Sequence, residues 1–220
     1  MSGSTTVVGE GWTFLTSGGS RRSLGRMGLP TLVCRPAIGQ RGHMATRDAT
    51  RPRAVVCDLE NFQELLVRPI RADDAPRLIA MHEGFSARTV HLRFLGSVRH
   101  LREPEAVRFA TVDGRDRAAL VAQNAHQALV AVARYDRLLG TNRAEVAVVV
   151  DDHYQHQGLG TAMLKLLISI AEAQGIEEFV AEVLANNHPI MATFRDAGLS
   201  IATRQHNGIA SVVMQLPAHP

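Results

Sequence analysis

Apolar residues follow a regular pattern only from about Leu65 onward. From Met1 to about Asn61 they come in short bursts without a period, among Gly, Ser, Thr, Arg and Pro. Such a segment buries too little apolar surface to offset the entropy lost on ordering, so we expect residues 1–61 to be disordered. Two alternatives stay open for this segment: an arginine-rich transit peptide, and a protein that starts at Met44.

The patterned region opens with a strand and three helices. Residues 65–70 read as the strand, and Asp73 is expected to cap a helix that has a proline in its first turn and reaches about Glu83. Apolar residues at helical spacing predict a second helix over 87–94 and a third that starts near Glu103.

The second half of the region contains most of the predicted strands. Three runs of small and β-branched residues, at 118–122, 129–133 and 144–150, have the composition of buried strands. The later elements are a helix at 160–174, a strand at 179–183, a helix at 189–197, and strands at 199–205 and 209–215 joined by Asn207-Gly208. This order predicts one domain over residues 65–217, a mixed α/β sheet with helices on both faces.

Composition limits the class of protein. The 220 residues are 45% hydrophobic and 20% charged, which is typical of a globular chain. A net charge of +3 favours a phosphate-bearing ligand but is too small to indicate nucleic acid. Neither cysteine, Cys34 or Cys57, has the Cys/His spacing of a zinc site. Because no apolar run approaches the roughly 18 residues of a membrane helix and no secretory signal is present, we expect a cytoplasmic protein without membrane or metal binding.

The segment that points to chemistry runs from Asp151 to Thr161, between a predicted strand and a predicted helix. Unpaired N–H groups at a helix start, together with the helix dipole, form an anion site, and glycines at 158 and 160 let the backbone approach a pyrophosphate closely. The Gly-Lys-Ser/Thr ending of a P-loop and the Gly-x-Gly-x-x-Gly of a dinucleotide fold are both missing. The glycines alone therefore leave a simple tight turn as the alternative.

Gln155-x-x-Gly158-x-Gly160 resembles the acyl-CoA signature of the GCN5-related N-acetyltransferases (GNAT), and the order of elements over Leu65–Leu216 is similar to theirs. Within that family the chain looks most like the bacterial Pat-type protein lysine acetyltransferases. The similar strings lie at 67–75, 92–94, 117–122, 132–135, 144–147 and 181–187. The resemblance implies the GNAT fold, a mixed and mostly antiparallel central sheet flanked by helices on both faces.

The same resemblance implies how acetyl-CoA would bind as co-substrate. Its pantetheine arm would run along Val148 to Val150 like an added strand, where this strand splays from the strand at 179–183. Asn187 would contact the CoA arm, cap the next helix, or do both. The pyrophosphate would rest on the loop that Gln155 opens, on backbone N–H groups of His156, Gln157, Gly158, Leu159, Gly160 and Thr161.

Glu145 is the predicted general base. A lysine amine has a pKa near ~10.4 and must lose a proton before it attacks. Glu145 is a carboxylate within an apolar strand, its burial would raise its pKa, and it matches the glutamate position of the Pat-type enzymes. The alternative is a structural ion pair with an arginine. The tyrosine that protonates the leaving thiolate in many relatives would stand four residues before Gly198, where this chain has Phe194.

We therefore expect an N-acetyltransferase that moves an acetyl group from acetyl-CoA directly to a primary amine, with a protein lysine as acceptor. Because Phe194 removes the usual acid, either the thiolate leaves unaided or catalysis is weak. A small-molecule amine acetyltransferase and a catalytically weak acyl-CoA-binding regulatory module are the alternatives. Some Pat-type enzymes carry a cyclic-nucleotide-binding domain, for which about 60 residues before Leu65 are too few, so we expect no cyclic-nucleotide control in this chain.

Overall fold

The computed structural model describes residues 33–36, 55–58, 64–93 and 100–217. Its strands are β1 (Val33–Pro36), β2 (Val55–Asp58), β3 (Glu64–Pro69), β4 (Arg117–Gln123), β5 (Leu129–Arg137), β6 (Arg143–Val150), β7 (Glu178–Leu184), β8 (Ser200–His206) and β9 (Ile209–Gln215). Its α-helices are α1 (Ala75–Glu83), α2 (Ala87–Arg93), α3 (Glu103–Ala110), α4 (Leu159–Ala173) and α5 (His188–Asp196), with 3₁₀ turns η1 (Ala72–Asp74) and η2 (Asp152–Tyr154). The predicted order of elements is confirmed.

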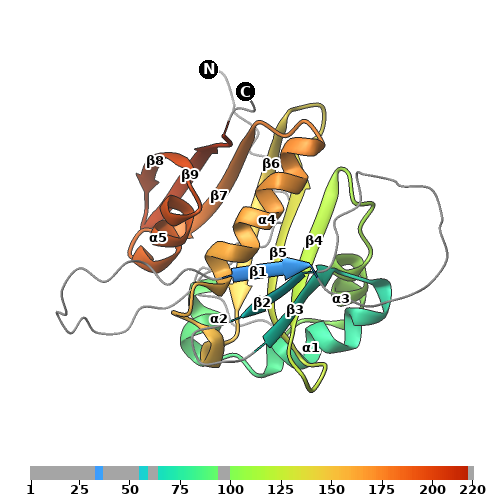
Figure 1. Ribbon diagram of the computed structural model, residues 1–220. Coiled ribbons are helices and arrows are strands. Elements are labelled where there is room, and N and C mark those ends of the chain that lie inside the picture. The colour runs from blue at the N-terminus through green and yellow to red at the C-terminus, as the bar shows by residue number, and fades with distance from the viewer. Residues whose placement is uncertain (1–32, 37–54, 59–63, 94–99, 218–220) are drawn as a thin grey trace.

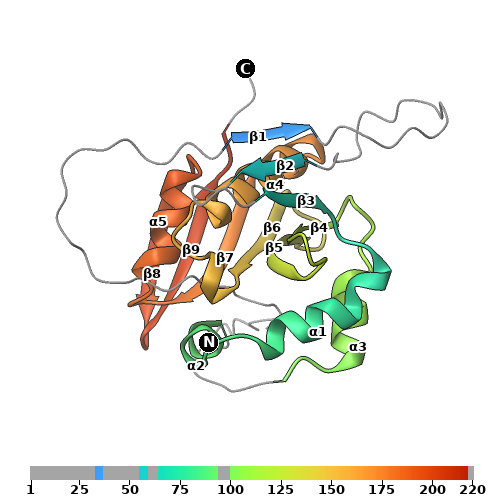
Figure 2. The ribbon, with the colours of Figure 1, turned by 60° about the horizontal axis from the view of Figure 1, so that its bottom comes forward.

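All described strands join one sheet in the order β1-β2-β3-β4-β5-β6-β7-β9-β8. Each neighbouring pair is antiparallel except β6 and β7, which are parallel and are connected through α4. Helices α4 and α5 cover one face, while α1, α2 and α3 lie at the other (Figures 1 and 2). The predicted fold, a mixed and mostly antiparallel sheet between two helical layers, is therefore confirmed.

Strand β6 is buried on both faces, because successive side chains of a strand point to opposite sides. Val146, Val148 and Val150 belong to the apolar core that includes Leu164 and Leu167 of α4. Ala147 and Val149 belong to the second core, on the side of α1 and α3. The run of small and β-branched residues at 144–150 is thus the buried strand that its composition predicts.

Two short strands lie inside the segment that we expected to be disordered. Strand β1 pairs with β2, and β2 pairs with β3, both antiparallel. These eight residues therefore extend the sheet and depart from that expectation. The other positions of residues 1–61 lie outside the described residues, so the boundary of the domain stays a prediction.

At the start of α1, the capping residue differs from the predicted one. Asp73 is exposed, whereas the adjacent Asp74 is fully buried. The Asp74 carboxylate accepts the backbone N–H of Arg71 at 2.9 Å and forms two hydrogen bonds with Arg68, at 2.7 and 2.8 Å. The prediction that Asp73 caps α1 was wrong, and the N-cap is Asp74. Arg68 on β3 provides a buried counter-charge for Asp74, which holds that residue at the start of the helix.

The longest helix in the described ranges is α4, with 15 residues. A helix needs about 20 apolar residues to cross a bilayer. No helix among the described residues is long and apolar enough to span a membrane.

Candidate functional site

The sheet opens between its two parallel strands. Strands β6 and β7 pair at only three positions, Arg143 with Glu178, Ala144 with Phe179, and Glu145 with Val180. Farther along, β6 pairs with β5 alone and β7 with β9 alone. The predicted splay between these strands is confirmed, and it begins directly after Glu145.

The edge of β6 that faces this opening carries backbone groups that β5 does not use. The amide of Asp151 donates to the carbonyl of Val130 at 2.8 Å. Because hydrogen-bonded and non-hydrogen-bonded pairs alternate along antiparallel strands, the backbone groups of Val146, Val148 and Val150 point away from β5. Their position suits a ligand that adds to β6 as a further strand.

The loop after β6 presents a helix N-terminus. Gly158 has φ +78° and is the N-cap of α4, and the first bond inside the helix runs from the amide of Ala162 to the carbonyl of Gly158 at 3.0 Å. The amides of Leu159, Gly160 and Thr161 therefore have no acceptor within the helix. With the helix dipole they form a site for an anion such as a pyrophosphate.

The two glycines of this loop differ in what their positions require. Among the described residues other than its two chain neighbours, none has an atom within 4 Å of the position that a Cβ on Gly158 would take. Gly158 is therefore needed for its left-handed backbone rather than for space. A Cβ on Gly160 would lie 3.5 Å from Cγ2 of Val150 and 3.8 Å from Cγ2 of Thr193. These are ordinary van der Waals distances, so the packing of α4 against β6 and α5 would admit a methyl group at Gly160.

The side chains of the two glutamines in the signature segment form hydrogen bonds with the backbone of the protein. Gln155 is buried, and its Nε2 donates to the carbonyl of Val150 at 2.9 Å. Gln157 donates through Nε2 to the carbonyl of His153 at 3.0 Å. The side chains of both residues therefore fix the path of the loop, while His156, with φ +62°, is exposed.

The side-chain amide of Asn187 is buried, and only one of its two polar atoms has a hydrogen-bond partner among the described residues. Its Oδ1 accepts the N–H of Ile190 at 3.3 Å, which confirms the predicted cap of α5. Its Nδ2 is buried and has no hydrogen-bond partner within the described part of the chain. A buried unpaired donor costs about 1–3 kcal/mol, so a ligand acceptor at this point would remove a penalty that the protein otherwise carries.

Glu145 lies half-buried at the mouth of the opening. On β6 it alternates with Ala144 and Val146, so it faces the side of the sheet away from α4. Burial raises the pKa of its carboxyl, and the nearby carboxylates of Asp136 and Glu182 raise it further.

The alternative of an arginine ion pair for Glu145 is not found among the described residues. Arg134, whose charge lowers the pKa of Glu145, instead binds Asp136, with Nη2 and Oδ2 2.7 Å apart.

The hydroxyls of Tyr135 and Tyr154 both form hydrogen bonds within the protein, and the usual acid position holds Phe194. Phe194 is buried in the core. Tyr135 is fully buried, donates its hydroxyl to the carbonyl of Arg115 at 2.8 Å, and has a pKa raised to about 12, mainly by burial. The Tyr154 hydroxyl accepts from Nδ2 of Asn124 at 3.2 Å, beside a groove of about 510 Å³ between α1 and the β4–β5 turn.

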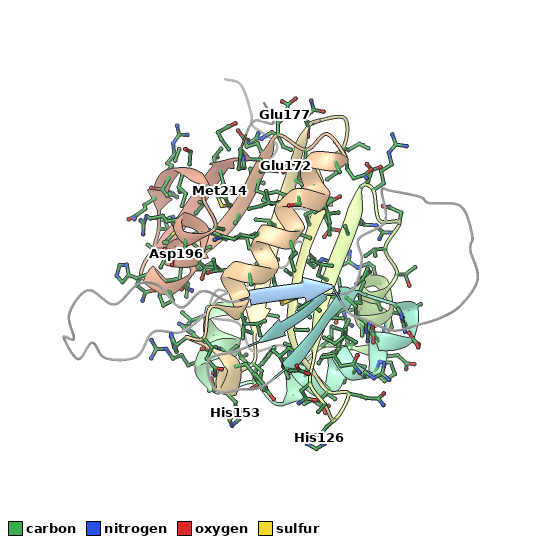
Figure 3. All side chains as sticks on the ribbon, in the orientation of Figure 1. His126, His153, Glu172, Glu177, Asp196 and Met214 are labelled. Carbon is green, nitrogen blue, oxygen red and sulfur yellow. The ribbon has the colours of Figure 1, made fainter. Side chains whose placement is uncertain are left out.

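The histidines of the loop lie at the surface. Figure 3 shows His153 at the edge of the molecule where α4 begins, opposite to Glu172 near the end of that helix. The His153 ring lies 3.0 Å from Oδ1 of Asp151. No cluster of three His, Cys, Asp or Glu side chains suited to a metal ion occurs among the residues that the structure describes.

Comparison with known proteins agrees with this geometry. The sequence profile of the acetyltransferase (GNAT) family matches residues 85–199. Acetyltransferase PA5475 of Pseudomonas aeruginosa is 26% identical over 132 residues, which are 59% of this chain and 71% of that protein. Acetyltransferase Pat of Mycolicibacterium smegmatis is 30% identical over 154 residues, which are 69% of this chain but only 45% of that longer protein.

A solved structure supports the same assignment. The crystal structure of the GNAT domain of S. lividans PAT is 29% identical, with a TM-score of 0.69, and the match covers 78% of this chain and all of that one. The family profile covers more than half of this chain and includes the opening, the glycine loop and Asn187. The chain therefore belongs to the acetyltransferase (GNAT) family, whose enzymes use acyl-CoA, and is an N-acetyltransferase.

Proposed function

We propose that this protein transfers an acetyl group from acetyl-CoA directly to a primary amine, and that the amine is the side chain of a protein lysine. The observation that carries the proposal is the place of Glu145, at the last paired position before β6 and β7 separate. The lysine acceptor rests on the resemblance to Pat-type protein lysine acetyltransferases, and the similarity to two Pat proteins supports it.

Three features of the chain suit acetyl-CoA. The free amides from Leu159 to Thr161 would hold the pyrophosphate. The backbone groups of Val148, which lie beyond the pairing with β7 and point away from β5, would pair with the amides of the pantetheine arm. The unpaired Nδ2 of Asn187 would donate to that arm. Together these groups lead from the loop toward Glu145, so the thioester would lie near the carboxylate.

In this proposal Glu145 accepts a proton from the incoming ammonium group. The neutral amine then attacks the thioester carbonyl, a C–N bond forms and the C–S bond breaks, and the nitrogen releases its second proton to the departing thiolate. A thiol with a pKa of about 8.5 leaves as a thiolate without a strong acid, which fits Phe194 in place of tyrosine. The same Phe194 is the observation that favours the alternative, an acyl-CoA-binding module of low turnover.

The test combines CoA-thiol release with mass spectrometry. Purified protein and acetyl-CoA are incubated with poly-L-lysine, a panel of lysine-containing proteins and a panel of small amines. We expect thiol release with the lysine polymers and acetyl-lysine in the protein products. Thiol release with small amines alone would show that the acceptor is a small amine and not a protein lysine. Tight CoA binding without thiol release under any condition would favour the regulatory module.

Gly158 allows a prediction with a matched control. Alanine at φ +78° costs about 1–2 kcal/mol in a left-handed backbone, so Gly158→Ala should relax the loop, lower the unfolding free energy, and weaken CoA binding by about five-fold or more. Gly208→Ala carries the same strain at φ +77° in the β8–β9 turn. Calorimetric titration with CoA should show weaker binding for the first variant only. Equal CoA affinities in the two variants would remove Gly158 from the phosphate site.

A further inference from the structure

The carboxylate of Asp152 binds a helix that is distant in sequence. Its Oδ2 accepts the backbone N–H of Ser86 at 2.9 Å, and its Oδ1 accepts the hydroxyls of Ser86 and Thr89, each at 2.8 Å. Ser86 directly precedes α2, and Thr89 lies in its first turn. Ser86 caps α2, because its Oγ accepts the backbone N–H of Thr89 at 3.2 Å. The side chain of Asp152 in η2 holds this cap from the loop that leads to the phosphate site.

The same contacts continue to the edge of β6. Nε2 of Gln155 lies 3.4 Å from Oγ1 of Thr89 and donates to the carbonyl of Val150 at 2.9 Å. Thr89 and Gln155 are both buried, so solvent does not replace these bonds easily. A continuous set of polar contacts thus joins α2, the phosphate loop and the opening between β6 and β7.

Helix α2 lies on the side of the sheet that Glu145 faces, and in the proposed function the acceptor amine approaches Glu145 from that side. It is on the face of the sheet away from α4, beside the end of β7 (Figure 2). It contacts β7, one of the two strands that border the opening. A shift of α2 would therefore change the acceptor side of the opening and leave the amides of Leu159 to Thr161 in place.

We propose that Asp152 is a positioning residue that fastens α2 to the phosphate loop, so that CoA binding at the loop also fixes the acceptor side of the site. The inference rests on the proposed function. Asp152 acts through Ser86 and Thr89 rather than on the reacting atoms. Hydrogen bonds from these two residues outweigh burial and lower the pKa of Asp152, so the carboxylate is ionised at neutral pH.

Two substitutions separate coupling from simple stabilisation. Asp152→Ala removes every acceptor, whereas Asp152→Asn keeps one oxygen for the Ser86 N–H, and the two hydroxyls can rotate to accept from its amide. Asparagine should therefore retain most of the coupling. Asp73→Ala, at an exposed aspartate in η1, serves as the control outside these contacts.

Hydrogen exchange with and without CoA is the first readout. In the wild type we expect CoA to slow exchange both at the start of α4 and in α2. In Asp152→Ala the protection at α4 should remain, while the protection gained at α2 should fall by about five-fold or more, and Asp152→Asn should restore it. Protection of α2 that is unchanged in the alanine variant would overturn the inference.

Steady-state kinetics with poly-L-lysine, together with calorimetric titration of CoA, provide the second readout. Asp152→Ala should raise KM for poly-L-lysine at saturating acetyl-CoA by about five-fold or more and change the Kd of CoA without acceptor much less. An equal loss of CoA affinity without acceptor would indicate a structural role and overturn the inference. If CoA protects no part of α4 in the wild type, the proposed donor site fails, and the inference fails with it. If CoA protects α4 but nothing is acetylated, the acceptor proposal fails, and exchange at α2 still decides the role of Asp152.

Discussion

Glu145→Gln is expected to lower kcat by about 10²-fold or more and to leave the affinity for CoA unchanged. Glutamine has nearly the same shape, but it does not accept the proton that a lysine ammonium must lose before it attacks. The residue lies at the end of the β6–β7 pairing, whereas the proposed contacts to CoA lie farther along β6 and in the loop. Calorimetric titration with CoA and steady-state thiol release measure the two effects separately.

The raised pKa of Glu145 adds a pH signature to this variant. Burial and the neighbouring carboxylates raise that pKa above 4.5, so the wild type should lose its base as the pH falls through the raised value. This acidic limb of the kcat/KM profile should be missing in Glu145→Gln. A carboxyl group whose pKa is higher in the folded state costs stability above its unfolded pKa. The variant should therefore be at least as stable as the wild type at neutral pH.

Glu182 offers a matched control on the adjacent strand. It is exposed, and it affects Glu145 only through charge. Glu182→Gln should keep kcat near the wild-type value and move the acidic limb of the profile to lower pH, because one source of repulsion is gone. Unchanged turnover in Glu145→Gln, or an equal loss in Glu182→Gln, would eliminate Glu145 as the base.

Patterns that are local in sequence predicted most of the fold. The apolar run that became β6 and the helical spacing that became α4 each needed only their own residues to be recognised. The Asn207-Gly208 turn is equally local, and both of its residues adopt positive φ. The splay between β6 and β7 was expected only because the chain resembles a family with that feature, since no local pattern specifies where strand pairing ends.

Contacts between distant residues could not be predicted in this way. Asp152 binds Ser86 across 66 positions, and Gln155 approaches Thr89 across the same interval. Nothing in either segment signals the other, so Asp152 was only part of a loop in the sequence. The environment of Glu145 has the same origin, because the strand register places Asp136 directly opposite.

The two adjacent aspartates before α1 show how a tertiary partner decides between similar residues. A capping preference does not separate Asp73 from Asp74, because both stand just before the proline-containing first turn. Arg68 separates them, because its buried guanidinium reaches only the second. Asp74 also accepts from Arg77 at 3.0 Å, so its carboxylate is held by several donors at once.

Asp74→Ala is therefore expected to lower the free energy of unfolding by about 3–5 kcal/mol, because it leaves the guanidinium of Arg68 buried without its counter-charge. Urea unfolding at neutral pH measures the loss. Asp73→Ala, at the exposed neighbour, should change the same quantity by no more than about 0.5 kcal/mol. Similar losses in the two variants would contradict the role of the buried pair.

The acid dependence of stability gives an independent check on the same pair. Burial by itself would raise the pKa of Asp74, but the donors from Arg68, Arg71 and Arg77 prevail and lower it to about 2. A carboxyl group with a lowered pKa in the folded state stabilises the protein above its unfolded value, here 3.8, and loses that contribution as the pH falls toward 2. The difference in stability between wild type and Asp74→Ala should therefore shrink across this interval. In a background with Arg68→Met, where no buried cation is left unpaired, Asp74→Ala should cost much less.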